Sequence, residues 1–274
     1  MNRLLNRWKT KYQYSIILLK ELVKTDFKLR YQGSVLGYVW SLLRPLFLFV
    51  ILYLVFDKIF NAGATIPHYP VYLLLGIVLW NYFLEVTNNG VTAVVAKGDL
   101  LRKLNFPKYV IVLAGSFSAL INLFINFVVV CVFMVFNGVE LHVTALIFPL
   151  LVIELFVFSL GLSFLLSALF VKFRDINYIW EIFMQAAFYA TPILYSLQFV
   201  IDKSELAAKI LMFNPVAQII QDSRFVLITD KAITYEHLYG SAIYRMVPVA
   251  IVLVIAIVSA FYFRKKSPSF AEEI

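Results

Sequence analysis

The chain has 274 residues, of which 62% are hydrophobic and only 15% charged, and its mean hydropathy is +0.86. A soluble domain carries about 25% charged residues, so the composition excludes a soluble globular protein and indicates a polytopic, all-α membrane protein, whose spans are apolar stretches of about 20 residues. The net charge of +8 fits the basic bias of cytoplasmic loops, and we expect no nucleic acid partner.

Residues 1–14 are polar and basic, we expect no cleaved signal peptide, and residues 1–35 are predicted to form a segment at the cytoplasmic interface. Apolar residues recur there at helical spacing, at Ile16, Leu19, Val23 and Phe27, while Lys20, Lys24 and Lys28 occupy another face. The pattern predicts a helix that lies in the cytoplasmic membrane interface. The alternative is an ordinary N-terminal helix packed on the rest of the protein.

The next stretch passes from this basic surface into an uncharged helix. Lys28 and Arg30 are expected at the lipid headgroups, where each basic residue contributes roughly 1 kcal/mol. Tyr38 and Trp40 belong to residue types that favour headgroup level, and Arg44 can snorkel toward it. Pro45 is expected in the first turn of a helix, where its missing N–H costs little. Residues 36–56 form the first predicted span.

Five further spans are predicted at residues 71–95, 109–136, 143–171, 176–195 and 247–263. Residues 196–246 are mixed in character and are expected to form an outer region. The apolar pieces at 188–201 and 210–228 are interrupted by Pro192 and Pro215, so they are poor candidates for full spans. Broken helices at membrane depth are tolerated where they are buried in protein or line a cavity. Residues 264–274 form a basic tail, and the whole chain is expected to be a single transmembrane domain.

Polar residues inside the predicted spans follow helical faces. The second span carries Asn81, Glu85, Asn88, Asn89 and Thr92, and the third carries Ser118, Asn122 and Asn126. A carboxylate and several amides are costly against lipid, so we expect the two faces to meet each other, other protein or water. In the fourth span Ser159, Ser163 and Ser167 form a line of small residues that permits close helix approach. Glu154 is a second carboxylate within a span.

The basic residues set the predicted orientation. With both termini and the loops at 96–108 and 172–175 on one side, that side holds 18 of the 24 Lys and Arg residues: nine through Arg44, four in the first loop, two in the second and three after residue 263. The other side holds six, which are Lys58, Lys203, Lys209, Arg224, Lys231 and Arg245. The bias predicts that both termini are cytoplasmic.

Signatures of intrinsic catalysis are missing from the sequence. It contains no G-x-x-x-x-G-K-[ST], G-x-S-x-G or H-E-x-x-H motif, and its single cysteine, Cys131, excludes an intrachain disulfide and a cysteine metal site. We therefore expect no metal site, no cofactor in this chain and no enzymatic activity. If the protein moves something uphill, the energy must come from another chain or from an ion gradient.

Five short segments together carry a family resemblance. They are R-Y-Q-G-S-V-L-G-Y-V-W-S-L-L-R-P-L at 30–46, K-L-N-F-P-K at 103–108, K-F-R-D-I at 172–176, and T-P-I-L-Y-S at 191–196 followed by F-N-P-V at 213–216. In this order and spacing the chain resembles the permease subunit of type 2 ABC exporters for polysaccharides, the family of the O-antigen, capsule and teichoic acid permeases. The opening segment is more similar to the O-antigen members.

The resemblance implies a bacterial inner-membrane homodimer with six spans per chain, re-entrant helices between spans five and six, and two copies of a separate ATPase that binds ATP and magnesium. It implies that the loop at 97–106 docks into the ATPase. There we expect apolar anchors at helical spacing with wet basic neighbours, which are Leu100, Leu101 and Leu104 with Arg102 and Lys103. The implied substrate is a glycan on a polyprenyl diphosphate lipid.

Spans one and five line the channel in this family, and here both carry aromatic residues. These are Phe49, Tyr53 and Phe56 in the first, and Trp180, Phe183, Phe188, Tyr189 and Tyr195 in the fifth. Rings match the C–H face of a sugar and tyrosine hydroxyls match its rim, so these residues are predicted to form the transport path. The alternative is that the rings pack only against lipid or neighbouring helices.

The leading functional hypothesis is ATP-driven export of an undecaprenyl-diphosphate-linked polysaccharide, of O-antigen type in preference to teichoic acid. The alternatives are an ABC exporter of a drug or small lipid, a membrane-embedded transferase acting on lipid-linked sugars, and a membrane scaffold. The transferase would need acidic or histidine side chains clustered at one membrane face, and this chain offers only isolated ones.

Overall fold

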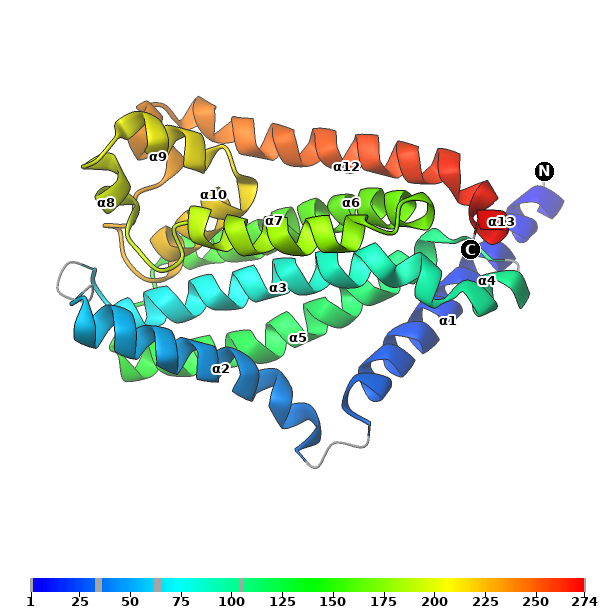
Figure 1. Cartoon of the computed structure of the whole chain (residues 1–274), viewed down its shortest axis with the longest axis horizontal. Coiled ribbons are helices and arrows are strands. Elements are labelled where there is room, and N and C mark those ends of the chain that lie inside the picture. The colour runs from blue at the N-terminus through cyan, green and yellow to red at the C-terminus, as the bar shows by residue number, and fades with distance from the viewer. Residues whose placement is uncertain (1, 33–35, 62–65, 104–105, 274) are drawn as a thin grey trace.

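The computed structural model describes residues 2–32, 36–61, 66–103 and 106–273, and within them every regular element is a helix. Both termini lie at the same end of an elongated bundle, and a group of short helices lies at the opposite end (Figure 1). The predicted all-α membrane architecture is confirmed at this level.

Four helices are long and apolar enough to cross a membrane: α3 (Tyr69–Ala96), α5 (Tyr109–Phe136), η4 with α6 (Val143–Ile147 and Phe148–Lys172), and α12 (Met246–Lys266) with η6 (Ser267–Ser269). They match four of the six predicted spans to within a few residues, apart from the C-terminal end of the last, which continues to Ser269. The match is close because each span is a long apolar run bounded by charged or turn residues.

The predicted first and fifth spans are shorter helices. The first consists of α2 (Trp40–Tyr53), preceded by the 3₁₀ turn η1 (Gly37–Val39) and continued by the π-helix η2 (Leu54–Ile59). The fifth is α7 (Ile176–Ala190), whose 15 residues rise about 22 Å, less than the roughly 30 Å of a hydrocarbon core. Pro45 was expected in the first turn of its helix, and that was wrong: α2 begins at Trp40, which places the proline in the helix interior.

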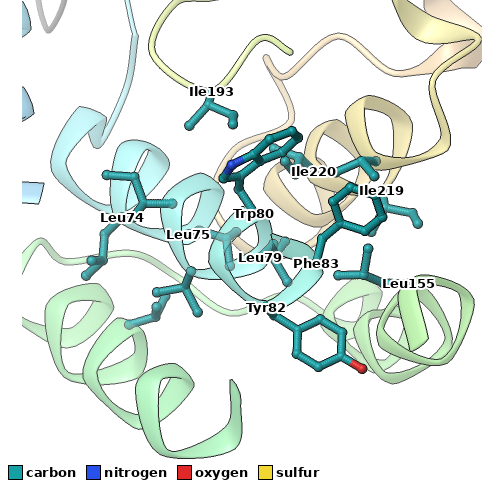
Figure 2. Packing of buried hydrophobic residues seen from close by; sticks show 14 of the residues in the cluster. Leu74, Leu75, Leu79, Trp80, Tyr82, Phe83, Leu155, Ile193, Ile219 and Ile220 are labelled. Atoms are coloured by element: carbon teal, nitrogen blue, oxygen red, sulfur yellow. The ribbon is translucent and has the colours of Figure 1, made fainter. Parts of the chain in front are cut away.

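Helix α3 forms the centre of the bundle, because 78% of its apolar stretch is buried within the protein, compared with 28% for α5. Its buried side chains contact α5, α6, α7 and α10 (Pro215–Leu227). Figure 2 shows Leu79, Trp80 and Phe83 of α3 packed close to Leu155 of α6 and Ile219 of α10. The rings of Phe83 and Phe158 stack with centroids 5.6 Å apart. Because α3 contacts helices on every side, its burial is decided by packing rather than by hydropathy.

Small and polar residues set the spacing between the long helices. Ser163 Oγ donates a hydrogen bond to the Val86 carbonyl oxygen at 3.0 Å, and a Cβ placed on Gly90 would collide with Ser163. Asn122 Nδ2 donates to Glu85 Oε2 at 2.7 Å between α5 and α3. The serine line therefore allows a close approach as predicted, and the polar faces of the second and third spans do meet.

The short helices opposite the termini are α8 (Leu197–Ile201), α9 (Glu205–Met212), α10, α11 (Tyr235–Tyr239) and η5 (Ala242–Arg245). We call residues 196–245 the cap (Figure 1). Ser196, Ser204 and Asn214 each accept a hydrogen bond from a backbone N–H in the first turn of α8, α9 and α10. Such side-chain caps stabilise helices that are too short to form alone.

The opposite end, which we call the base, contains α1 (Asn2–Tyr31), α4 (Gly98–Lys103) and α13 (Phe270–Glu273). A separate apolar cluster holds it together through Leu22, Leu101, Phe263 and Phe270, all of them buried. Lys20, Lys24 and Lys28 of α1 are exposed, while Leu22 packs on protein. The α1 helix thus combines features of the interface helix and of the packed alternative.

Candidate functional site

Arg224 of α10 is a fully buried arginine that joins three parts of the chain. Its Nε donates to the Tyr72 carbonyl oxygen at 3.1 Å, its Nη1 to that of Pro192 at 2.6 Å and its Nη2 to that of Ile193 at 2.8 Å. Its Cζ also lies 3.4 Å from the centroid of the Tyr72 ring. A guanidinium presents several donors in a rigid fork, so one side chain binds three backbone carbonyls, one in the first turn of α3 and two just after α7. We call this arrangement the Arg224 clamp.

A glycine makes room for the clamp. A Cβ on Gly76, one turn along α3 from Tyr72, would lie 2.6 Å from Arg224 Nη2. Any side chain at this position would therefore displace the guanidinium. From the sequence, Arg224 was expected only as one of the six basic residues of the outer side. The signal that identifies it as buried is a single positive charge inside the apolar run at 210–228.

The two segments T-P-I-L-Y-S and F-N-P-V, which are far apart in the sequence, meet beside the clamp. Asn214 Nδ2 donates to Thr191 Oγ1 at 3.3 Å, and Tyr69 Oη donates to the Leu194 carbonyl oxygen at 3.1 Å. Asn214 also caps α10 by accepting from Val216 N–H, with Pro215 at the first helical position. The end of α7 is thereby fixed to both α3 and α10, so a movement of any one of the three would be transmitted to the others.

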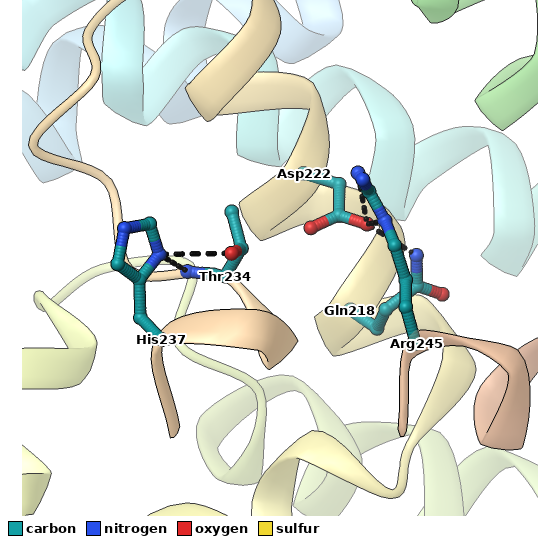
Figure 3. A network of polar contacts seen from close by, with 5 residues as sticks. All are labelled: Gln218, Asp222, Thr234, His237 and Arg245. Carbon is teal, nitrogen blue, oxygen red and sulfur yellow. Dashed lines mark hydrogen bonds and ion pairs between the residues drawn. The ribbon is translucent and has the colours of Figure 1, made fainter. Parts of the chain in front are cut away.

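A second buried charge lies on another face of α10. Asp222 is fully buried, and its Oδ2 accepts from Arg245 Nη2 at 3.1 Å and from Gln218 Nε2 at 2.7 Å (Figure 3). Burial raises the pKa of Asp222, whereas Arg245 and Gln218 act to lower it. Close by, Thr234 and His237 form a capping box at the start of α11. The ion pair ties α10 to η5, which leads directly into α12.

The eight predicted transport-path residues divide into two environments. Phe49 is buried against Phe133 of α5, with ring centroids 5.3 Å apart, and Tyr53 stacks on Phe49 and on Tyr69. Phe56 is half-buried and contacts Phe60. The three rings of the first span therefore line up on one face as expected, but that face is packed mainly against this chain's own helices.

The five path residues of the fifth span are more open. Phe183 and Tyr189 are exposed, whereas Phe188 packs edge-on against Trp80 and Trp180 lies half-buried beside Phe183. Tyr195 Oη donates to the Tyr189 carbonyl oxygen at 3.0 Å. The structure does not gather the eight residues into one wall, so their role in transport stays a prediction.

Helix α7 presents a continuous exposed apolar strip that sequence analysis identified only in part. Its members are Tyr178, Ile179, Ile182, Phe183 and Tyr189, each more than half exposed. We call it the α7 strip. Its spacing places all five residues on one helical face, and Met184 on the opposite side is buried. An exposed strip of this size marks a surface in contact with lipid, another chain or a transported molecule.

The predicted coupling residues also occupy different environments. Arg102 and Lys103 of α4 are exposed, while Leu101 is buried with Phe270 in the cluster at the base and Leu100 packs against that cluster. Leu104 lies outside the described residues. The anchoring leucines therefore hold α4 to this chain, and the surface that α4 offers to a partner is charged.

The predicted headgroup residues can be placed only in part. Lys28, Trp40 and Arg44 are exposed. The side chains of Arg30 and Tyr38 lie outside those that the structure describes. No group of three or more His, Cys, Asp or Glu residues that could hold a metal ion is found among the described residues.

Comparison with known proteins places these features in a family. The chain matches the model of the ABC-2 type transporter over residues 17–228. It is 29% identical over 263 residues to the O-antigen export system permease protein RfbA of Myxococcus xanthus, which covers 96% of this chain and 97% of that protein. It is 30% identical over 233 residues to a protein of the same name from Klebsiella pneumoniae, covering 84% and 88%.

The matched region runs from α1 through α10 and so includes the Arg224 clamp, the α7 strip and α4. Members of this class are transporter permeases rather than enzymes, and they pair with an ABC ATPase subunit. With four helices long enough to cross a membrane, the chain is a multi-pass membrane permease. It therefore belongs to the ABC-2 type transporter family.

Proposed function

We propose that this chain is the transmembrane subunit of an ATP-driven exporter that moves an undecaprenyl-diphosphate-linked polysaccharide of O-antigen type across the bacterial inner membrane. The observation that carries the proposal is the near full-length similarity to permeases named for O-antigen export, which extends over 96% of the chain. The missing phosphate-binding motif agrees with it, since ATP and magnesium would be bound by a separate ATPase.

In this proposal the chain crosses the membrane six times with both termini in the cytoplasm. Helix α2 with η2, and α7 with residues 191–195, provide the first and fifth crossings. The position of both termini at the base supports an even number of crossings (Figure 1). The exposed basic residues at the base, including Lys28, Arg102 and Lys103, support its cytoplasmic assignment.

The functional unit is proposed to be a homodimer with two ATPase copies. The α7 strip is proposed to face the second protomer or the glycan, since it includes the rings of Tyr178, Phe183 and Tyr189, which can pack against the C–H face of a sugar. The α4 helix would meet the ATPase through Arg102 and Lys103. Movement of α4 would reach the core because Leu101 is buried in the cluster that also holds Phe106 and Val110 at the start of α5.

Deleting the gene in its source strain, with the ATPase left intact, tests this function. We expect surface O-antigen to disappear while lipid-linked polymer accumulates inside the cell, and a plasmid copy to restore the surface glycan. A deletion strain that keeps its surface O-antigen and loses export of another compound would refute the proposed substrate.

A further inference from the structure

The chain beyond α12 folds back onto the base. It turns through η6 into α13, and α13 contacts α4 (Figure 1). Ser267 Oγ donates to the Arg264 carbonyl oxygen at 3.1 Å, and Ser269 Oγ donates to that of Lys266 at 3.0 Å, so side chains within the turn help to hold it. We call residues 267–273 the hook. It is a folded element placed against α4, and neither the transport path nor the charged face of α4 assigns it a role.

The K-L-N-F-P-K segment ends with a lysine that binds the hook. Lys108 Nζ donates to the carbonyl oxygens of Ser267 and Pro268, the second at 3.3 Å. The same ammonium lies 5.8 Å from the centroid of the Phe270 ring, within reach of a cation–π contact. Burial lowers the pKa of Lys108, while the nearby Glu272 carboxylate acts to raise it. Because Lys108 immediately precedes α5, one ammonium joins the hook to the start of that helix.

Phe270 joins the hook to two helices. It is 1% exposed, and its ring meets that of Phe263 in α12 edge-on, with centroids 5.3 Å apart. The buried cluster at the base contains both rings together with Leu101 of α4. Aromatic side chains supply large apolar areas, so the loss of one ring from so small a cluster would loosen its other members. Phe270 therefore links the position of α4 to that of α12.

Helix α4 depends on such contacts because it has only six residues. Isolated helices shorter than about 12–15 residues are marginal in water, so the orientation of α4 must come from packing. Just before α4, Lys97 forms an ion pair with Asp26 of α1 at 2.8 Å. The hook provides a second support, in the cluster that buries Leu101. Arg102 and Lys103 stay exposed, so α4 is held in one orientation with its charged face open.

We propose that the hook positions α4 for its contact with the ATPase, and that Lys108 and Phe270 are the positioning residues. The inference rests on the proposed function, in which α4 meets the ATPase through Arg102 and Lys103. A contact element that is already held in its binding orientation loses less entropy when the partner binds. Because Phe270 also packs on Phe263, a displacement of α4 by the ATPase acts on α12 as well as on α5.

The test uses the full-length permease in nanodiscs with purified ATPase. In Lys108→Met and Phe270→Ala we expect faster hydrogen exchange at the amides of residues 98–103, measured by mass spectrometry. We also expect weaker ATPase binding, because a helix that keeps its docking orientation about 10–20% of the time binds about five- to tenfold more weakly. Lys108→Arg, which keeps the donors, should restore the affinity. The matched controls are exposed Lys266→Met and buried Phe83→Ala, which lies in α3 outside the base and should lower stability without changing the Kd for the ATPase.

The proposal is overturned if the two hook variants bind the ATPase as tightly as their controls, or if exchange at residues 98–103 is unchanged. An equal loss of affinity in Phe83→Ala would also overturn it, because reduced stability alone would then explain the effect. If Phe270→Ala does not accumulate in the membrane, Lys108→Met decides the outcome. Neither measurement uses a glycan, so a negative result leaves the proposed substrate standing, whereas failure of the proposed function would appear as surface O-antigen in the deletion strain.

Discussion

At the scale of single residues, the most consequential side chain is Arg224, which no motif identified. A buried guanidinium is expensive unless its donors are all paired, and here backbone carbonyls and the Tyr72 ring take that role. The sequence showed a charge in an apolar run but could not show its partners, because the carbonyls that it binds belong to α3 and to the residues after α7.

Replacing Arg224 should test the clamp directly. Arg224→Met removes three buried hydrogen bonds to backbone carbonyls and is expected to destabilise the protein by roughly 3–5 kcal/mol. The stability of Arg224→Lys should lie between that of the unaltered protein and that of Arg224→Met, because a single ammonium cannot reproduce the guanidinium fork. Heating in detergent followed by size-exclusion chromatography measures the effect, with exposed Lys203→Met as control. An Arg224→Met protein as stable as that control would show that the clamp does not hold the fold.

The hydrogen bond between Asn122 and Glu85 could be predicted in outline, because polar faces of membrane spans are costly against lipid and therefore tend to pair with each other. A double-mutant cycle with Glu85→Ala and Asn122→Ala should give a coupling energy of about 1 kcal/mol, the usual range for polar contacts between membrane helices. Thermal unfolding of the two single variants and the double variant provides the values. Strict additivity would mean that the contact contributes nothing to stability.

At the scale of elements, α4 is held by its leucines and exposes its charges. Arg102→Glu with Lys103→Glu should weaken copurification of the ATPase about tenfold or more while leaving the stability of the permease unchanged. Leu101→Asp should instead destabilise the base, since it places a carboxylate in the cluster with Phe270. If Leu101→Asp instead abolished copurification of the ATPase without destabilising the permease, the leucines of α4 would be the residues that dock into the ATPase, as the sequence predicted.

Substitutions of aromatic residues in α2 and α7 should have different effects, because Tyr53 packs on other rings whereas Tyr189 is exposed. Tyr189→Ala removes an exposed ring and is expected to lower polysaccharide export several-fold with normal complex assembly and ATP hydrolysis. Tyr53→Ala also removes packing on Phe49 and Tyr69, so it should lower stability as well. Phe261→Ala, an exposed ring on α12, is the matched control. If Tyr189→Ala and Phe261→Ala export equally, the α7 strip does not form part of the path.

At the scale of the whole molecule, the sequence predicted the all-helical class, four long spans and the polar faces of those spans well, because each of these depends on local composition. Four spans followed from apolar runs, and the serine line on α6 followed from its spacing. Packing that depends on distant partners was not predictable. The burial of Phe49 requires Phe133, the burial of Leu101 requires a C-terminal tail more than 160 residues away, and the clamp requires α3.

The proposed topology can be measured with single cysteines in a Cys131→Ala background. Lys203→Cys in the cap should react with an impermeant thiol reagent applied to the outer face, and Lys265→Cys at the base should not, because both side chains are exposed but at opposite ends of the bundle. If only Lys265→Cys were labelled, the orientation in the membrane would be the reverse of the one that the basic residues predict.

The proposed activity of this permease is ATP-driven movement of lipid-linked O-antigen across the membrane. The most direct measurement uses proteoliposomes that contain the permease, its ATPase and undecaprenyl-diphosphate-linked O-polysaccharide on one side. We expect the polymer to become accessible to a glycan-degrading enzyme on the other side only when ATP and magnesium are added, and to stay protected with an ATPase unable to hydrolyse ATP. Access at the same rate without ATP, or no access with ATP, would contradict ATP-driven export by this permease.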